Sequence, residues 1–313
     1  MLHEESLDNK KGRIALLLKK NIKFRLKGHE SFYIREGWLR KGMKSIENNE
    51  FFFTESNAAD NLGVGSNMVK SIKYWLHVTG LADESIAEKG KRKQTVTIDF
   101  GQVINDYDPC FEDIFTLWLI HYKIASNKEL ATSWYLFFNN LNAQEFSKDD
   151  LRIAMLNTTK LYLKDQSFSE NTLNDDVNCV LKTYFTDKKE DKNPEDTIIC
   201  PLTELGLLKK LNVNGNEVYL KTKPSTDKLH KLIVLYIIRE NMNKQKSTTI
   251  EKILSDTCNA GKILNLDRNL LNYYLDELKN DNYIQIIRTA GLDTIYLKKD
   301  CDCKDILLEY YTL

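Results

Sequence analysis

Several features that would assign a function directly are missing from this chain of 313 residues. It has four prolines and no apolar run that approaches the roughly 20 residues needed to cross a membrane. The N-terminus places Glu4, Glu5 and Asp8 before a basic segment and lacks the apolar core of a signal peptide. We therefore expect a globular protein of the cytoplasm with no membrane partner.

Cysteine and histidine also lack the spacing of a metal site. The six cysteines are scattered, and Cys301-Asp302-Cys303 supplies two thiolates where a structural zinc needs four ligands. The five histidines show no paired spacing. No P-loop, dinucleotide-binding glycine motif or nucleophile elbow occurs, so the sequence predicts no metal, no cofactor and no enzyme.

The chain has no net charge, because 45 basic residues balance 45 acidic ones, but the charges are unevenly distributed. Residues 1–98 carry 18 Lys+Arg against 12 Asp+Glu, whereas residues 99–200 carry 10 against 18. Residues 19–27 hold five cations and no acid. Clustered cations favour a phosphate backbone, although a solvated charged face is the simpler interpretation.

The basic part contains a helix-turn-helix pattern. A short helix from Ala58, the turn Gly63-Val64-Gly65 and a longer helix ending near Gly80 follow one another, with Ser66 as the expected N-cap. In the longer helix, Met68, Ile72, Trp75 and Leu76 form an apolar stripe. A basic loop and a strand at 94–98 follow, which together are typical of a winged helix.

The remaining chain repeats this theme. Residues 109–141 predict two packed helices broken near Ser126, and residues 147–222 predict two capped helices followed by a hairpin at Asn214-Gly215. Residues 224–313 predict three helices, at 229–241, 250–257 and 267–279, and two strands around a wing at 289–293. The expected fold is mainly α with small β-hairpins, in tandem winged helix-turn-helix-like units at 1–98, 99–223 and 224–313. Because the third helix of the last unit carries Asp276 and Glu277, that unit is assigned to protein contacts or a homodimer.

Three groups of residues carry a family resemblance, at 28–42, 62–76 and 200–202. Gly28-His29-Glu30-Ser31-Phe32 is followed by Arg35, by Trp38-Leu39 with Lys41-Gly42, and by the segment 62–76. Together with Cys200-Pro201-Leu202, these motifs resemble a bacterial family of unknown function over about residues 24–222. Its members are often encoded beside DNA phosphorothioation genes, which implies a role in DNA modification or in defence built on it.

The first hypothesis is a non-enzymatic component of such a system that binds double-stranded DNA. The exposed faces of the longer helix, the basic loop and the preceding segment would supply the contacts, and the residues predicted to bind DNA are Ser66, Asn67, Lys70, Ser71, Lys73, Tyr74, Lys91, Arg92, Lys93, Arg35 and Lys41.

Two alternatives remain. In the first, the chain is an adaptor whose winged-helix units bind a partner enzyme of the same system. In the second, His29, Glu30 and Arg35 form an enzyme site, with His29 as base and Arg35 as anion clamp. A structural interpretation of that segment is that His29 and Glu30 brace the helix beginning near Glu36.

Overall fold

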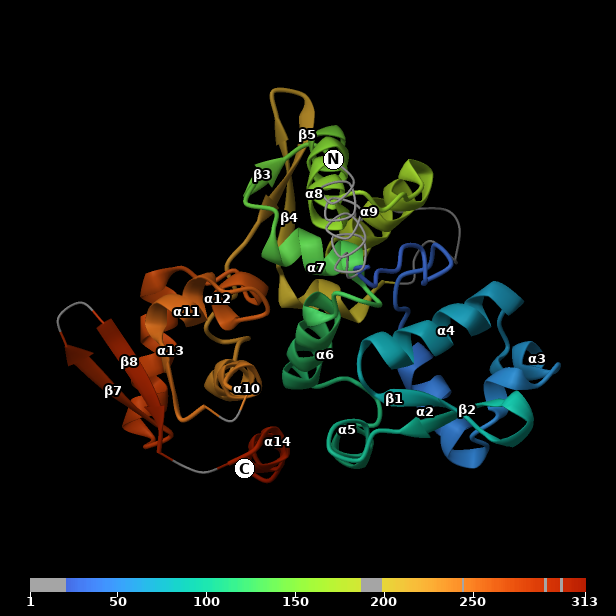
Figure 1. Ribbon diagram of the computed structural model, residues 1–313, viewed down its shortest axis with the longest axis horizontal. Helices are drawn as coiled ribbons and strands as arrows, with labels where there is room; N and C mark the ends of the chain where they lie inside the picture. Colours follow the sequence, from blue (N-terminus) through green and yellow to red (C-terminus); the bar gives the residue numbers. More distant parts are fainter. Residues whose placement is uncertain (1–20, 187–198, 244, 290–291, 299–300) are drawn as a thin grey trace, which may run out of the picture.

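The computed structural model describes residues 21–186, 199–243, 245–289, 292–298 and 301–313 (Figure 1). Helices dominate and every sheet is small and antiparallel, which confirms a mainly α fold with β-hairpins. Figure 1 shows the N-terminal elements on one side of α6 (Ile114–Ser126) and the C-terminal elements on the other. Ten residues of α6 are buried, so this helix lies at the centre of the core.

The N-terminal elements pack helix against helix beside one hairpin. Gly42 allows the close approach, since a Cβ atom there would lie 2.8 Å from Leu76 Cδ1 and 2.9 Å from Ile72 Cγ2. The elements are α2 (Trp38–Asn48), η1 (Phe52–Thr54), α3 (Ala58–Leu62), α4 (Ser66–Val78), β1 (Ala82–Ile86), η2 (Glu88–Gly90), β2 (Arg92–Val96) and α5 (Gly101–Tyr107).

The middle and C-terminal parts share one topology. In each, a short first strand pairs with the last strand, which pairs in turn with the strand between them, in the orders β3-β5-β4 and β6-β8-β7. The middle part has α7 (Thr132–Asn139), β3 (Glu145–Phe146), α8 (Lys148–Leu163), α9 (Glu170–Tyr184), η3 (Pro201–Leu205), β4 (Leu208–Val213) and β5 (Asn216–Lys221). The C-terminal part has α10 (Lys231–Asn241), β6 (Ser247–Thr249), α11 (Ile250–Ser255), α12 (Ala260–Ile263), α13 (Arg268–Asn280), β7 (Ile284–Thr289), β8 (Leu292–Leu297) and α14 (Cys303–Tyr311).

The sequence correctly predicted the starts of two helices and one hairpin turn. Ser147 and Asp150 form the predicted capping box of α8, and Asp267 caps α13. Asn214 and Gly215 both have positive φ, as the tight turn between β4 and β5 requires. The elements α5, α14, β1, α12, β3 and β6 were not predicted, and the last three contain too few residues to show a periodicity.

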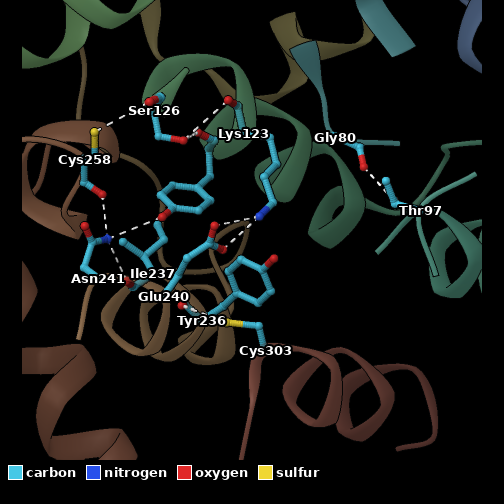
Figure 2. Close-up of polar contacts among 11 residues, drawn as sticks. Gly80, Thr97, Lys123, Ser126, Tyr236, Ile237, Glu240, Asn241, Cys258 and Cys303 are labelled. Atoms are coloured by element: carbon cyan, nitrogen blue, oxygen red, sulfur yellow. Dashed lines mark hydrogen bonds and ion pairs between the residues drawn. The ribbon is translucent and has the colours of Figure 1, made fainter. Parts of the chain in front are cut away.

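Contacts across α6 join the three parts. Lys123 of α6 lies 2.8 and 2.9 Å from the carboxylate oxygens of Glu240 on α10 (Figure 2). Its ammonium lies 5.2 Å from the ring centres of Phe100 and Tyr236. The last helix returns to α6, where the rings of Phe115 and Tyr310 stack with centroids 3.6 Å apart. None of the helices in the described ranges is both long and apolar enough to cross a membrane.

Candidate nucleic-acid interface

The predicted reading helix is α4, and its first turn is exposed. Ser66, Asn67 and Lys70 all face solvent there, and Lys70 Nζ donates to Asn67 Oδ1 at 3.2 Å. Gly65, and not Ser66, is the N-cap, and no side chain caps the helix. Backbone N–H groups at this end are therefore available to an anion.

Two residues assigned to the exposed face of α4 are buried, and that part of the prediction is wrong. Ser71 has no exposed surface, and its hydroxyl lies 3.5 Å from the carbonyl oxygen of Phe32. Tyr74 is 4% exposed and donates to the carbonyl oxygen of Leu130 at 2.8 Å. Helix α4 is covered on two sides, so its buried face is wider than the predicted apolar stripe.

Helix α2 brings a further cation to the same turn. Lys41 Nζ lies 3.4 Å from the carbonyl oxygen of Leu62, the last residue of α3, and its side chain is exposed. Gly63 follows with φ +66° and leads into α4. Lys41 and Lys70 thus stand on the two helices that meet the turn, and neither forms an ion pair within the described residues.

The basic hairpin is largely neutralised by acids of its own unit. Glu84 of β1 forms ion pairs with Lys73 and Arg92, and Lys93 lies 2.6 Å from Glu50. Partial burial alone would raise the pKa of Glu84, but hydrogen bonds from Lys73, Gln94 and Arg92 lower it to about 2. The carboxylate is therefore charged at neutral pH. Lys91 remains exposed, with its ammonium 6.0 Å from the ring centre of Phe51.

In the GHE segment, Gly28 and His29 are buried in the core and Glu30 is partly exposed. His29 is completely buried, and its Nε2 atom lies 2.8 Å from Oδ1 of Asp176 on α9. The same carboxylate accepts from Lys27 N at 2.7 Å and from Ser133 Oγ at 2.6 Å. The prediction that His29 braces the helix near Glu36 is wrong, since His29 joins the N-terminal segment to α9.

Gly28 packs equally closely. A Cβ atom at Gly28 would lie 2.3 Å from the ring of Tyr74. The His29 ring stacks on Trp75 and meets Trp134 edge to face, with centroids 6.2 and 5.4 Å apart. These contacts pack Gly28 and His29 against α4 and α7.

The other two residues of the enzyme alternative have different surroundings. Glu30 is partly exposed and adopts φ +50°. Arg35 lies over the rings of Phe32 and Trp38, with its guanidinium carbon 5.5 and 5.4 Å from their centres. Within the described residues, no hydrogen bond or ion pair joins any two of His29, Glu30 and Arg35.

The chain matches a known protein family over most of its length. A family model for a protein of unknown function, DUF4007, matches residues 26–311. The chain belongs to this family. The match extends beyond the segment 24–222 in which the motifs were recognised and includes the C-terminal part. No curated protein matches the chain.

Two solved structures share the fold of this family member. A magnesium ion-bound SspB crystal structure has a TM-score of 0.81 and 23% identity, and the match covers 92% of this chain and 88% of that one. A second SspB crystal structure has the same score and identity and covers 93% and 89%. In this chain, the described residues contain no group of three or more His, Cys, Asp or Glu side chains that could hold a metal ion.

The sequence did not reveal two features of the site. Asp176, whose carboxylate contacts His29, lies 147 residues after His29 in the sequence, within a predicted amphipathic helix. The sequence pattern does not distinguish Asp176, which is buried on α9, from its neighbour Asp175, which is partly exposed and ion-paired with Lys27. A cavity lined by Arg35 could not be predicted either, because the residues that line it come from segments far apart in sequence.

Proposed function

We propose that this protein is a DNA-binding, non-enzymatic component of a DNA phosphorothioation system or a related modification or defence system. The family resemblance of its motifs implies that setting, and the fold it shares with SspB is compatible with it. Lys41 and Lys70 carry the proposal for DNA, because both are exposed beside an uncapped helix N-terminus.

The proposed interface comprises Lys41, Ser66, Asn67 and Lys70. Phosphate oxygens would accept from the lysines and from backbone N–H groups of α4, while Asn67 would reach a base edge or a modified backbone. Lys91 would extend the contact from the hairpin. Lys73, Arg92 and Lys93 would contribute less, because each first has to leave an acid.

The winged-helix interpretation belongs to the same proposal. The order of helices and strands in the middle and C-terminal parts places a short strand beside the last strand of each sheet, as winged helices do. In the C-terminal part we retain protein contacts, including a homodimer, since Asp276 is exposed on α13.

The test is a titration of the purified chain with short duplex DNA, unmodified and phosphorothioated, at two salt concentrations. The variant Lys41→Gln with Lys70→Gln should lower the slope of log affinity against log salt by about 2, since each lost phosphate contact removes about 0.9. A matched control removes Lys209 and Lys279, which are exposed on β4 and α13. An equal slope in both variants would remove Lys41 and Lys70 from the interface.

An adaptor is the second candidate, and exposed apolar side chains favour it. Ile86, opposite Arg92 in the β1–β2 hairpin, is 76% exposed, and Ile98 after β2 is 75% exposed. Ile86 lies near the tip of the hairpin and Ile98 beyond its opposite end, and each offers an exposed apolar side chain to a partner. Absence of DNA binding at low salt would leave this candidate ahead.

A further inference from the structure

A cavity of about 610 Å³ lies where the start of α2, the loop before α6 and η3 meet. Its floor is apolar, with Leu39, Leu117, Ile120 and Leu202 among the lining residues. This volume falls within the range of roughly 300–1,000 Å³ typical of small-molecule sites. The cavity is separate from the proposed DNA interface, and the inference drawn from it does not rest on that function.

Arg35 is one of the residues that line this cavity. Its Nε atom is buried and has no hydrogen-bond partner among the residues that the structure describes. The planar guanidinium is held over Phe32 and Trp38, so its orientation is fixed. A buried donor without an acceptor costs free energy, and an arginine fork matches the two oxygens of a carboxylate or phosphate.

The first turn of α2 lines the same cavity through Leu39 and Arg40. Gly37 occupies the N-cap position, no side chain caps the helix, and no acid lies in its first turn. Uncapped N–H groups and the helix dipole favour an anion there. Arg35 and the helix end therefore point to the same ligand chemistry from two independent features.

Motifs that are distant in sequence meet at this cavity. Arg35 and Leu39 come from the N-terminal motifs, and Cys200, Pro201 and Leu202 come from the third motif. Among the residues that line the cavity, Arg35 has a buried side-chain donor without a hydrogen-bond partner in the described part of the chain. A binding site accounts for why these segments converge.

The rim limits what the ligand can be. Glu36, Glu112 and Glu204 line the cavity and are exposed. They repel anions, so an oxyanion has to lie at the Arg35 end of the cavity, and they would accept hydrogen bonds from hydroxyl or amino groups. The ligand should therefore carry one oxyanion, an apolar body and neutral donors at its outer end.

We propose that this cavity binds a small organic oxyanion of about mononucleotide size, with its phosphate or carboxylate held by Arg35 and the start of α2. The probes are adenosine 5′-monophosphate, hexanoate and inorganic phosphate, each titrated calorimetrically into the full chain. Binding of the nucleotide alone would identify a phosphate ligand, and binding of hexanoate alone would identify a carboxylate ligand. The organic probe that binds should do so more tightly than inorganic phosphate, which cannot use the apolar floor.

The variant Arg35→Gln should weaken binding of the organic probe at least about tenfold, as expected for loss of a charge-assisted pair. Arg35→Lys keeps the charge without the fork and should give an intermediate loss. Arg25→Gln is the matched control, because Arg25 also lies over an aromatic ring, that of Tyr74, but does not line the cavity. Equal affinity in the Arg35 and Arg25 variants would overturn the proposal.

Cys110 gives a second readout that needs no variant. It lines the cavity and is partly exposed, whereas Cys179 and Cys200 are fully buried. Bound ligand should slow alkylation of Cys110 by N-ethylmaleimide, measured by peptide mass mapping, while leaving Cys258 unaffected. If none of the three probes binds, or if Cys110 reacts at the same rate with bound probe, the assignment is wrong.

Discussion

His29 Nε2 lies 2.8 Å from Asp176 Oδ1, and both side chains are buried. This contact fixes the N-terminal segment to α9, with Ser133 and the backbone of Lys27 completing the hydrogen bonds of the carboxylate. A histidine in a candidate enzyme motif is thus held by packing and by one buried acid.

Replacing Asp176 should therefore destabilise the fold. Asp176→Ala leaves three donors without their acceptor, and we expect a loss of about 3 kcal/mol in the free energy of unfolding, measured by urea denaturation. Asp175→Ala is the control, because Asp175 is partly exposed and its ion pair with Lys27 should contribute less than about 1 kcal/mol. Similar losses in the two variants would contradict the role given to the buried carboxylate.

His121 should make the protein sensitive to acid. Burial lowers the pKa of His121 to about 4, although a hydrogen bond to the carbonyl oxygen of Ile263 opposes the shift. The carbonyl accepts from Nε2–H at 2.9 Å, so Nδ1 of the neutral ring accepts from the Tyr184 hydroxyl at 2.8 Å.

The unfolded chain binds a proton at this histidine near pH 6.5, whereas the folded chain binds it only near pH 4. Stability is therefore lost as the pH falls from about 6.5 to 4, by up to about 1.4 kcal/mol per unit. Urea denaturation at pH 7 and pH 4.5 should show a smaller acid loss for His121→Gln than for the wild type. The same acid loss in both would refute the assignment.

Lys221 should produce a dependence of the same sign at alkaline pH. Its ammonium donates to the carbonyl oxygens of Phe137 and Leu141 at 2.7 and 2.9 Å. Burial, with a smaller effect of Lys262, lowers the pKa of Lys221 from 10.5 to about 7. Between these values the unfolded chain holds more protons, so stability rises with pH.

Measurements at pH 7 and pH 9 test this sign. From pH 7 to 9 the wild type should gain about 2 kcal/mol relative to Lys221→Met, at up to about 1.4 kcal/mol per unit. Lys209→Met, at an exposed position of β4, should follow the wild type. A gain that is the same in all three proteins would show that Lys221 does not titrate in this range.

Gly42 should tolerate no large side chain. Leucine there would collide with Leu76 and Ile72 and separate α2 from α4, at a cost of roughly 1–3 kcal/mol or more. Thermal unfolding of Gly42→Leu should show the loss, together with weaker DNA binding if α2 and α4 form one interface. Gly65→Ala is the control, because no atom lies within 4 Å of the added Cβ.

The sequence by itself determined the local structure. Ser147 and Asp150 specify the start of α8, Asp267 specifies the start of α13, and Asn214-Gly215 specifies a hairpin turn. Each signal acts within a few residues, since a cap or a left-handed turn depends on its immediate neighbours. The family motifs could be recognised for the same reason, because each is a short run of neighbouring residues.

Only the tertiary structure decided which faces of these elements meet solvent. Tyr74 and Ser71 appeared exposed from helical periodicity, but packing on a second side of α4 buries them. Arg92 and Lys93 appeared free, but acids from β1 and from before η1 pair with them. Burial and ion pairing depend on partners distant in sequence, as with Asp176 for His29 and with the walls around Arg35, and no local pattern records such partners.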